Sequence, residues 1–98
     1  MADTAVRLHP LAEDEAKSAH PWYADRSIAA ADEFLKELDA AMAAIANAPD
    51  RWPRIHNRYR RFLLHKFPFS IVYIQRQSFV EVIAVAHHRR RPGYWKRR

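Results

Sequence analysis

The C-terminal stretch 84–98, AVAHHRRRPGYWKRR, carries most of the side chains whose chemistry suggests a function. It holds six Lys or Arg, two His, one Tyr and one Trp, and it contains no Asp or Glu. Guanidinium groups bind carboxylates and phosphates, and a histidine with its ordinary pKa exchanges protons near neutral pH. We therefore expect this stretch to contact an acidic partner; the alternative is a disordered, solvated tail.

The positive charge is concentrated in the second half of the chain. Residues 1–50 carry four Lys/Arg and ten Asp/Glu, whereas residues 51–98 carry thirteen Lys/Arg and a single acidic residue, Glu81. This asymmetry predicts a basic face that meets nucleic acid, a nucleoprotein or an acidic protein. A membrane surface is disfavoured, because the basic residues do not line an amphipathic helix. A charge that serves only solubility is the remaining interpretation.

The length and composition limit the architecture and the chemistry. A chain of 98 residues that is 49% hydrophobic predicts one domain, spanning residues 1–98. The chain has no cysteine, which excludes disulfides and thiolate metal sites. His87 and His88 are adjacent on a predicted strand and so point to opposite sides, and we expect neither a metal nor a cofactor. No signal peptide or spanning segment is recognisable, so we expect a cytoplasmic protein.

Hydrophobic periodicity predicts a strand near residues 5–9 and two helices that form a hairpin over residues 11–47. Pro21 lies inside the first helix and predicts a kink or an early end there. Ser27 is the expected N-cap of the second helix. The apolar stripe of that helix is expected to contain Ile28, Ala31, Leu35, Leu38, Met42 and Ile45.

Three further strands are predicted at residues 58–65, 69–75 and 79–87, which gives the order β-α-α-β-β-β and an α+β fold. In the last strand, Val80, Val82, Ala84 and Ala86 are expected to share one face. Because both faces of that strand are mostly apolar, we expect it to be central in the sheet. Residues 88–98 are then expected to leave the sheet as a basic, aromatic arm.

Several motifs together resemble the RelE/ParE superfamily of bacterial type II toxins. They are "WY" at the end of the first helix, "ANAPDRWP" after the second, "RRFLLHKFPFSIVY" and "VIAVAHHRRRPGYW". The resemblance implies a helical hairpin packed on one face of a small antiparallel sheet. It also implies a growth-inhibiting toxin of a plasmid-stabilisation type module, neutralised by a cognate antitoxin whose acidic or amphipathic C-terminal segment wraps around the toxin.

The superfamily contains two mechanisms. RelE-like members cut messenger RNA on the ribosome, whereas ParE-like members inhibit DNA gyrase and hydrolyse nothing. Where RelE-type enzymes carry two lysines on the first strand of the C-terminal sheet, this chain has Arg61 and Leu63. The position of a phosphate-clamping arginine holds Ser70, and another arginine position holds His88. Since two cationic positions are missing and the hairpin is long, the resemblance favours the ParE branch.

The nuclease alternative stays open, and with it the question of whether the protein is an enzyme. RNA cleavage requires a base, an acid and cations for the phosphorane charge, and His88 with Tyr94 would be the catalytic pair. The expected partner is DNA gyrase, or the ribosome with mRNA in the alternative, and a heterotetramer or larger assembly with the antitoxin is expected. A non-toxic, antitoxin-binding module is the third possibility. The residues expected to contact the target or the antitoxin are Arg58, Arg60, Arg61, Arg89, Arg90, Arg91, Tyr94 and Trp95.

Overall fold

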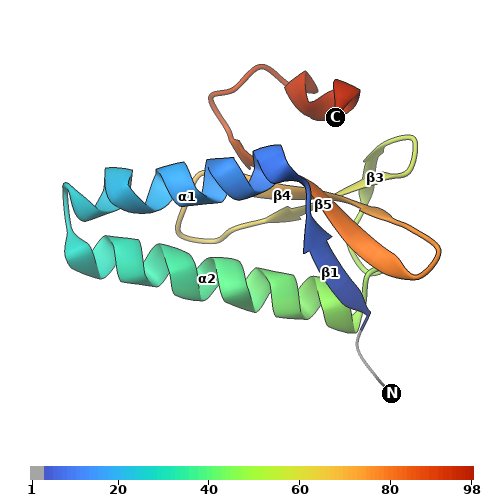
Figure 1. Ribbon diagram of the computed structural model, residues 1–98, viewed down its shortest axis with the longest axis horizontal. Helices are drawn as coiled ribbons and strands as arrows, with labels where there is room; N and C mark the ends of the chain where they lie inside the picture. Colours follow the sequence, from blue (N-terminus) through green and yellow to red (C-terminus); the bar gives the residue numbers. More distant parts are fainter. Residues whose placement is uncertain (1–3) are drawn as a thin grey trace.

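The computed structural model describes residues 4–98, which form two α-helices, a sheet and a short 3₁₀-helix (Figure 1). The predicted order of elements is confirmed, with one short strand added before the first predicted C-terminal strand. The elements are β1 (Ala5–Leu8), α1 (Pro10–Ala24), α2 (Ile28–Asn47), β2 (Arg54–His56), β3 (Tyr59–Leu63), β4 (Phe69–Gln75), β5 (Phe79–His87) and η1 (Tyr94–Arg97).

The five strands form one sheet in the order β1-β5-β4-β3-β2. The neighbours from β5 to β2 are antiparallel, as expected for successive hairpins, whereas β1 runs parallel to β5 with Ala5 opposite Phe79 and Leu8 opposite Val82. The central position predicted for β5 is therefore confirmed. Strand β2 was not predicted, because three residues directly after Pro53 carry too little periodicity to indicate a strand.

A β-bulge in β5 reverses which alternate side chains face the helices. Tyr73 pairs with Val82 but Val72 pairs with Ala84, so Ile83 is the extra residue. Before the bulge, Val80 and Val82 face the helices; after it, Ala84 and Ala86 lie on the other face. The prediction that these four residues share one face is wrong, because an inserted residue reverses the alternation.

Helix α2 packs one apolar stripe on the sheet. Ser27 caps it, since its hydroxyl accepts a hydrogen bond from the Ala30 amide, as predicted. The buried stripe is Ala31, Phe34, Leu38, Ala41 and Ile45. The predicted stripe was wrong at Ile28 and Leu35, which are 74% and 39% exposed, because the buried face is centred on Phe34.

Helix α1 begins at Pro10 and continues through Pro21 to Ala24, so of the two alternatives predicted at Pro21, a kink or an early end, the early end is wrong. The Asp25 amide still donates to the Pro21 carbonyl, which keeps the last turn closed. Tyr23 stacks on Phe34 and joins the end of α1 to the core. Neither helix in the described part of the chain is apolar over a length that would cross a bilayer.

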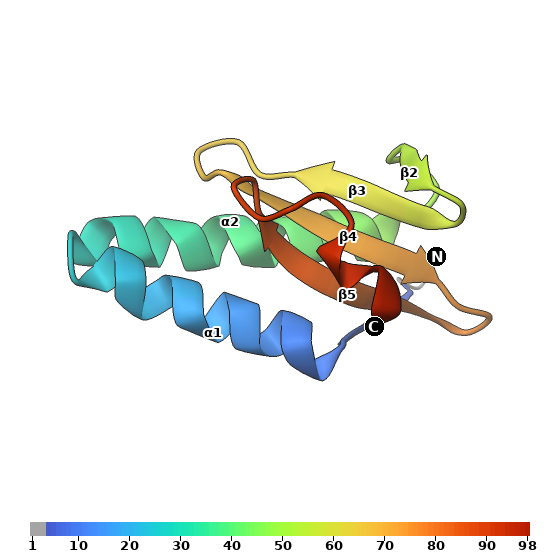
Figure 2. The ribbon, with the colours of Figure 1, turned by 90° about the horizontal axis from the view of Figure 1, so that it is seen from above.

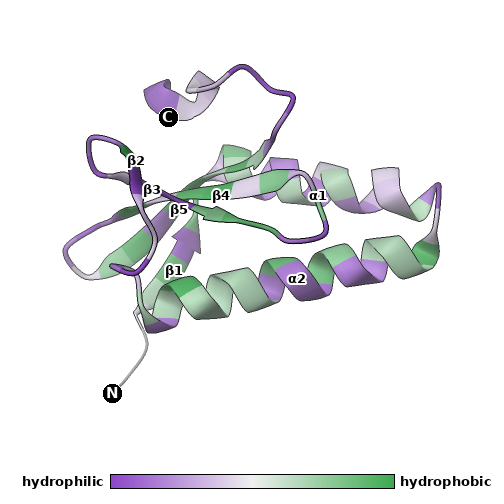
Figure 3. Ribbon diagram, turned by 180° about the vertical axis from the view of Figure 1, so that it is seen from behind, coloured by the Kyte–Doolittle hydropathy of each residue, from purple (hydrophilic) through white to green (hydrophobic). Residues whose placement is uncertain are grey.

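The two faces of the sheet have different covers. The helices lie on one face, over a core that includes Ile71, Tyr73 and Val85. Residues 88–98, here called the C-terminal arm, cross the other face above β4 and β5 (Figure 2). There Trp95, which is 6% exposed, packs in a smaller cluster with Val72. Hydropathy colouring shows hydrophobic central strands beneath a hydrophilic arm (Figure 3).

Candidate functional site: a cation-lined cavity beneath the C-terminal arm

Small side chains on the arm face of the sheet leave a hollow. The register sets Leu63 opposite Ser70 and Ser70 opposite Ala86 in one row across β3, β4 and β5. In the next row Val72 pairs with Ala84. Since Ser and Ala project little from a sheet, the space between this floor and the arm remains open, with a volume of about 570 Å³. We call this hollow the arm cavity.

The arm forms the roof of this cavity because two of its residues hold it at a fixed height. Gly93 turns the chain with a φ of 78°, a left-handed conformation that glycine adopts without strain. Trp95 then inserts towards the sheet, with its ring 4.7 Å from that of Tyr59 between centroids. The arm is therefore an ordered part of the fold, and the alternative of a disordered tail is wrong.

The cavity is lined by cations and histidines. Among its lining residues within the described chain there is no Asp or Glu. Its lining includes His56, Arg61, His87, His88, Arg90, Arg91 and Lys96. A surface of one sign around a concave site attracts an oppositely charged ligand, so this cavity is suited to bind an anionic group.

One carboxylate, that of Glu15 on α1, ties the arm to the body of the protein. Arg98 donates to both of its oxygens, at 2.8 and 2.9 Å, and the Tyr94 hydroxyl donates at 2.5 Å. The Val85 amide donates to the same carboxylate at 3.0 Å. Burial raises the pKa of Glu15, but the hydrogen bonds from Arg98, Tyr94 and Val85 outweigh it and the pKa is lowered.

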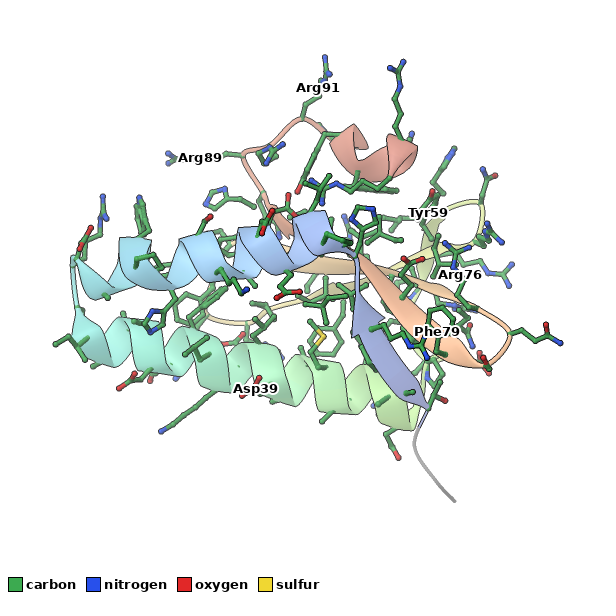
Figure 4. The ribbon with its side chains drawn as sticks, viewed as in Figure 1. Asp39, Tyr59, Arg76, Phe79, Arg89 and Arg91 are labelled. Carbon is green, nitrogen blue, oxygen red and sulfur yellow. The ribbon has the colours of Figure 1, made fainter. Side chains whose placement is uncertain are left out.

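The structure brings together most of the residues that the sequence pointed to. Arg61, His88, Arg90, Arg91, Tyr94 and Trp95 all line the arm cavity. Arg89 lies on the outside of the arm, and Figure 4 shows the side chains of Arg89 and Arg91 pointing away from the body of the protein. Arg58 lies outside β3, in the exposed turn after β2.

Arg60 is positioned differently from Arg61. It lies on the opposite face of β3 and donates to the carbonyls of Asp50 and Trp52 and to the side chain of Gln75. These contacts hold the loop before β2 against the sheet. The guanidinium of Arg60 therefore has a structural role within the fold.

His88 and Tyr94 share the cavity wall, but each is hydrogen-bonded to another residue. His88 Nε2 lies 2.9 Å from the Ser70 hydroxyl, and the Tyr94 hydroxyl donates to Glu15. Burial and the Glu15 contact raise the pKa of Tyr94, so it stays a neutral phenol. The described residues contain no hydrogen bond between the two side chains, and the arrangement suits anion binding better than proton transfer.

Metal chemistry finds no support in this geometry. Among residues 4–98, no three His, Asp or Glu side chains converge as metal ligands would. His87 packs edge-on against the Phe69 ring, with 5.0 Å between ring centroids. Burial and the neighbouring Arg89 and His88 lower the pKa of His87.

A second hollow lies beside the first. It runs between α1 and β5 with a volume of about 580 Å³, and we call it the edge groove. Its lining is more apolar and includes Leu11 and Trp22, which are 46% and 52% exposed. Arg90 and His87 line both hollows, so the two sites share a wall.

Sequence reasoning missed Glu15, Ser70 and the edge groove as parts of the site. In the sequence, Glu15 is one of three adjacent acidic residues near the start of a helix, where negative charge is favoured in any case. Yet it lies three residues after Ala12 and four before Ala19, which places a carboxylate on the buried face of the helix. An acidic residue on such a stripe signals a buried partner. Ser70 was read as a missing cation, and nothing local to its strand predicted its bond to His88.

The structure has a helical hairpin on one face of a small sheet and a basic arm over the other face. This is the architecture expected of a RelE/ParE-like toxin. Residues 6–92 match the family described as "ParE toxin of type II toxin-antitoxin system, parDE". This match covers most of the chain, and the protein belongs to the ParE toxin family.

Individual relatives agree with this assignment. The chain is 26% identical over 89 residues to "Toxin ParE2" of Mycobacterium tuberculosis, from strains CDC 1551 / Oshkosh and ATCC 25618 / H37Rv. The match spans 90% of this chain and 85% of that protein. A solved structure described as "Chromosomal ParDE TA system from P. aeruginosa" shares the fold, with a TM-score of 0.75 at 10% identity over 86% of this chain and 95% of that chain.

Proposed function

We propose that this ParE-family toxin inhibits growth by acting on DNA gyrase, without hydrolysing any substrate. The observation that carries this proposal is the pairing of Ser70 with His88. Ser70 brings no charge, and it binds the imidazole that the nuclease mechanism would need. The arm cavity therefore presents cations such as Arg61 and Lys96, and the described residues show no hydrogen bond between His88 and Tyr94 as a base and an acid.

The proposed role of the basic surface is docking. Arg61, Arg91 and Lys96 line the cavity and have no acidic partner among the described residues. Unpaired surface cations accelerate association with an acidic target and weaken with added salt. The target in this proposal is an acidic surface of gyrase, and the site of action is the cytoplasm.

The proposed regulator is a cognate antitoxin, as in the family to which the chain belongs. Its acidic or amphipathic segment would cover the same cations and lie in the apolar edge groove, lined by Leu11 and Trp22. The expected assembly is a heterotetramer or larger. Co-expression with the neighbouring gene's product, followed by light scattering of the purified complex, tests this part of the proposal.

One observation favours the second candidate, a ribosome-dependent endoribonuclease. His88, Arg61 and Tyr94 line one cavity together, and a substrate could exchange the hydrogen bonds of His88 and Tyr94 for its own. In that case His88 would be the base and Tyr94 the acid.

A single expression experiment separates the possibilities. The protein is induced from a tightly repressed promoter, and gyrase supercoiling in extract is assayed within minutes beside primer extension on abundant messages. We expect supercoiling to fall while transcripts remain intact. Cleavage at codons with normal supercoiling would overturn the proposal in favour of the nuclease, and neither effect would indicate a non-toxic antitoxin-binding module.

A further inference from the structure

We propose that Glu15 is a positioning residue: it fixes the C-terminal arm over the sheet and so sets the shape of the arm cavity. Its carboxylate accepts hydrogen bonds from two arm residues, Arg98 and Tyr94. A third arm residue, Arg90, lies 3.5 Å away as an ion pair. Glu15 itself does not line the cavity, so it acts through the arm.

The position of Glu15 lets one carboxylate join α1, β5 and the C-terminal arm. Strand β1 ends at Leu8 opposite Val82, and beyond this point no strand of residues 4–98 lies on that side of β5. Glu15 accepts from the amide of Val85, and Arg98 donates to the carbonyl of Ile83, the residue at the bulge, at 3.1 Å. The Glu15–Arg98 pair therefore replaces a strand along this part of β5 and attaches the arm there.

The contact between Glu15 and Arg98 is largely buried, and its two hydrogen bonds give it a fixed orientation. The side chains of Glu15 and Arg98 are 14% and 10% exposed, so water and salt screen the pair little. A two-pronged guanidinium–carboxylate contact fixes both distance and orientation. Trp95 also holds the arm, but its contacts with the sheet are apolar and tolerate sliding. Trp95 therefore keeps the arm close to the sheet, whereas Glu15 fixes the position of the arm along β5.

The position of Arg90, one of the cations of the arm, also depends on Glu15. The Arg90 guanidinium lies 3.8 Å from the centre of the Tyr94 ring, and the Tyr94 hydroxyl is bound to Glu15. Releasing Glu15 would thus free Arg90 and Tyr94 together. The cavity roof would lose its fixed height while the core on the helix side remained intact.

Glu15→Gln separates this role from simple support of the strand edge. The glutamine oxygen can still accept from the Val85 amide, but the charge and the second acceptor for Tyr94 and Arg98 are lost. Arg98→Ala removes the arm's side of the contact and leaves Glu15 in place. Glu13→Gln is the matched control, because Glu13 is on the same helix and forms its ion pair with the exposed Lys17.

Hydrogen exchange of the purified protein is the measurement. We expect amide exchange in residues 94–98 to accelerate about tenfold or more in Glu15→Gln and in Arg98→Ala, with exchange in α2 and β4 unchanged. The double variant should accelerate exchange by less than the product of the two single effects, because both changes remove the Glu15–Arg98 contact. Glu13→Gln should match the wild type.

Two results would overturn the proposal: arm exchange that stays at the wild-type rate in either single variant, or acceleration that spreads equally over α2 and β4. The effect on toxicity rests on the proposed function and is read separately, as inhibition of purified gyrase supercoiling. A wild type that leaves gyrase active would refute the proposed function while the exchange result still decides the role of Glu15.

Discussion

Ser70 and His88 are joined by a 2.9 Å hydrogen bond between the serine hydroxyl and the imidazole Nε2. The resemblance to RNA-cleaving relatives places arginines at both positions. Here a hydroxyl and an imidazole occupy them, and the two side chains form a hydrogen bond with each other between β4 and the end of β5. The floor of the cavity therefore lacks the cations that would hold a phosphodiester in position for cleavage.

Replacing both residues, as Ser70→Ala with His88→Ala, tests whether this pair has a catalytic role. We expect inhibition of gyrase to stay within about threefold of wild type, because the docking cations are untouched. Loss of a general base costs about 10²- to 10⁴-fold in rate, so a nuclease would lose nearly all activity. The measurement is the half-inhibitory concentration in a supercoiling assay, with primer extension in parallel.

Arg89 and Arg91 are expected to act in docking alone. Both are exposed and project from the arm, whereas Arg90 between them contacts Glu15 and Tyr94. The double variant Arg89→Ala, Arg91→Ala should weaken toxicity about three- to tenfold, less so at high salt, with stability within about 0.5 kcal/mol of wild type.

Removing the same number of charges elsewhere provides the control for this prediction. Lys17→Ala with Lys36→Ala takes two cations from the helices and should leave toxicity unchanged. Equal weakening by both double variants would mean that net charge, and not the arm, determines binding. A large drop in the thermal midpoint of the arm variant would instead assign Arg89 and Arg91 a structural role.

Arg60→Ala should destabilise the fold by about 1–3 kcal/mol, because it leaves two backbone carbonyls and Gln75 without a charged donor. Arg60→Lys should recover little of this, since a single ammonium cannot reproduce the planar set of donors. Urea unfolding measures the loss. Arg54→Ala, at an exposed position in β2, is the control and should be neutral. Equal stability of the Arg60 and Arg54 variants would contradict the structural role.

The lowered pKa of Glu15 predicts an acid-dependent contribution to stability. A carboxyl group whose folded-state pKa lies below its ordinary value of 4.5 stabilises the fold fully above that value and loses the contribution as pH falls through the folded-state pKa. Thermal midpoints of wild type and Glu15→Gln should therefore differ most above pH 4.5 and converge in acid. A difference that stays constant down to the most acidic pH would contradict this assignment.

Local patterns predicted the helices, four of the five strands in the described chain and the central place of β5, since these depend on periodicity within short windows. The bulge at Ile83 was not predictable, because both faces of β5 are apolar and either alternation fits the sequence. Ile28 and Leu35 are exposed because the face of α2 that packs on the sheet is centred on Phe34. Tertiary packing decides which face that is.

The candidate site was predicted as a set of residue types but not as a geometry. The basic arm and most of its cavity residues were expected, whereas the binding of Tyr94 by Glu15 depends on α1 lying beside the arm. Arg60 and Arg61 look equivalent in the sequence, and only the faces of β3 separate a structural arginine from a surface one. Such assignments require contacts between residues distant in the chain, which no local pattern encodes.

The parallel pairing of β1 with β5 joins segments from the two ends of the chain. The helical hairpin and the β3-β4-β5 hairpins close short loops, whereas β1 meets β5 only after the long loop from Ala5 to Phe79 has closed, at a greater entropic cost. The contact of Glu15 with the arm spans a similar separation. We therefore expect the helices and central strands to form early in folding, and the basic cavity to be the last part of the molecule to assemble.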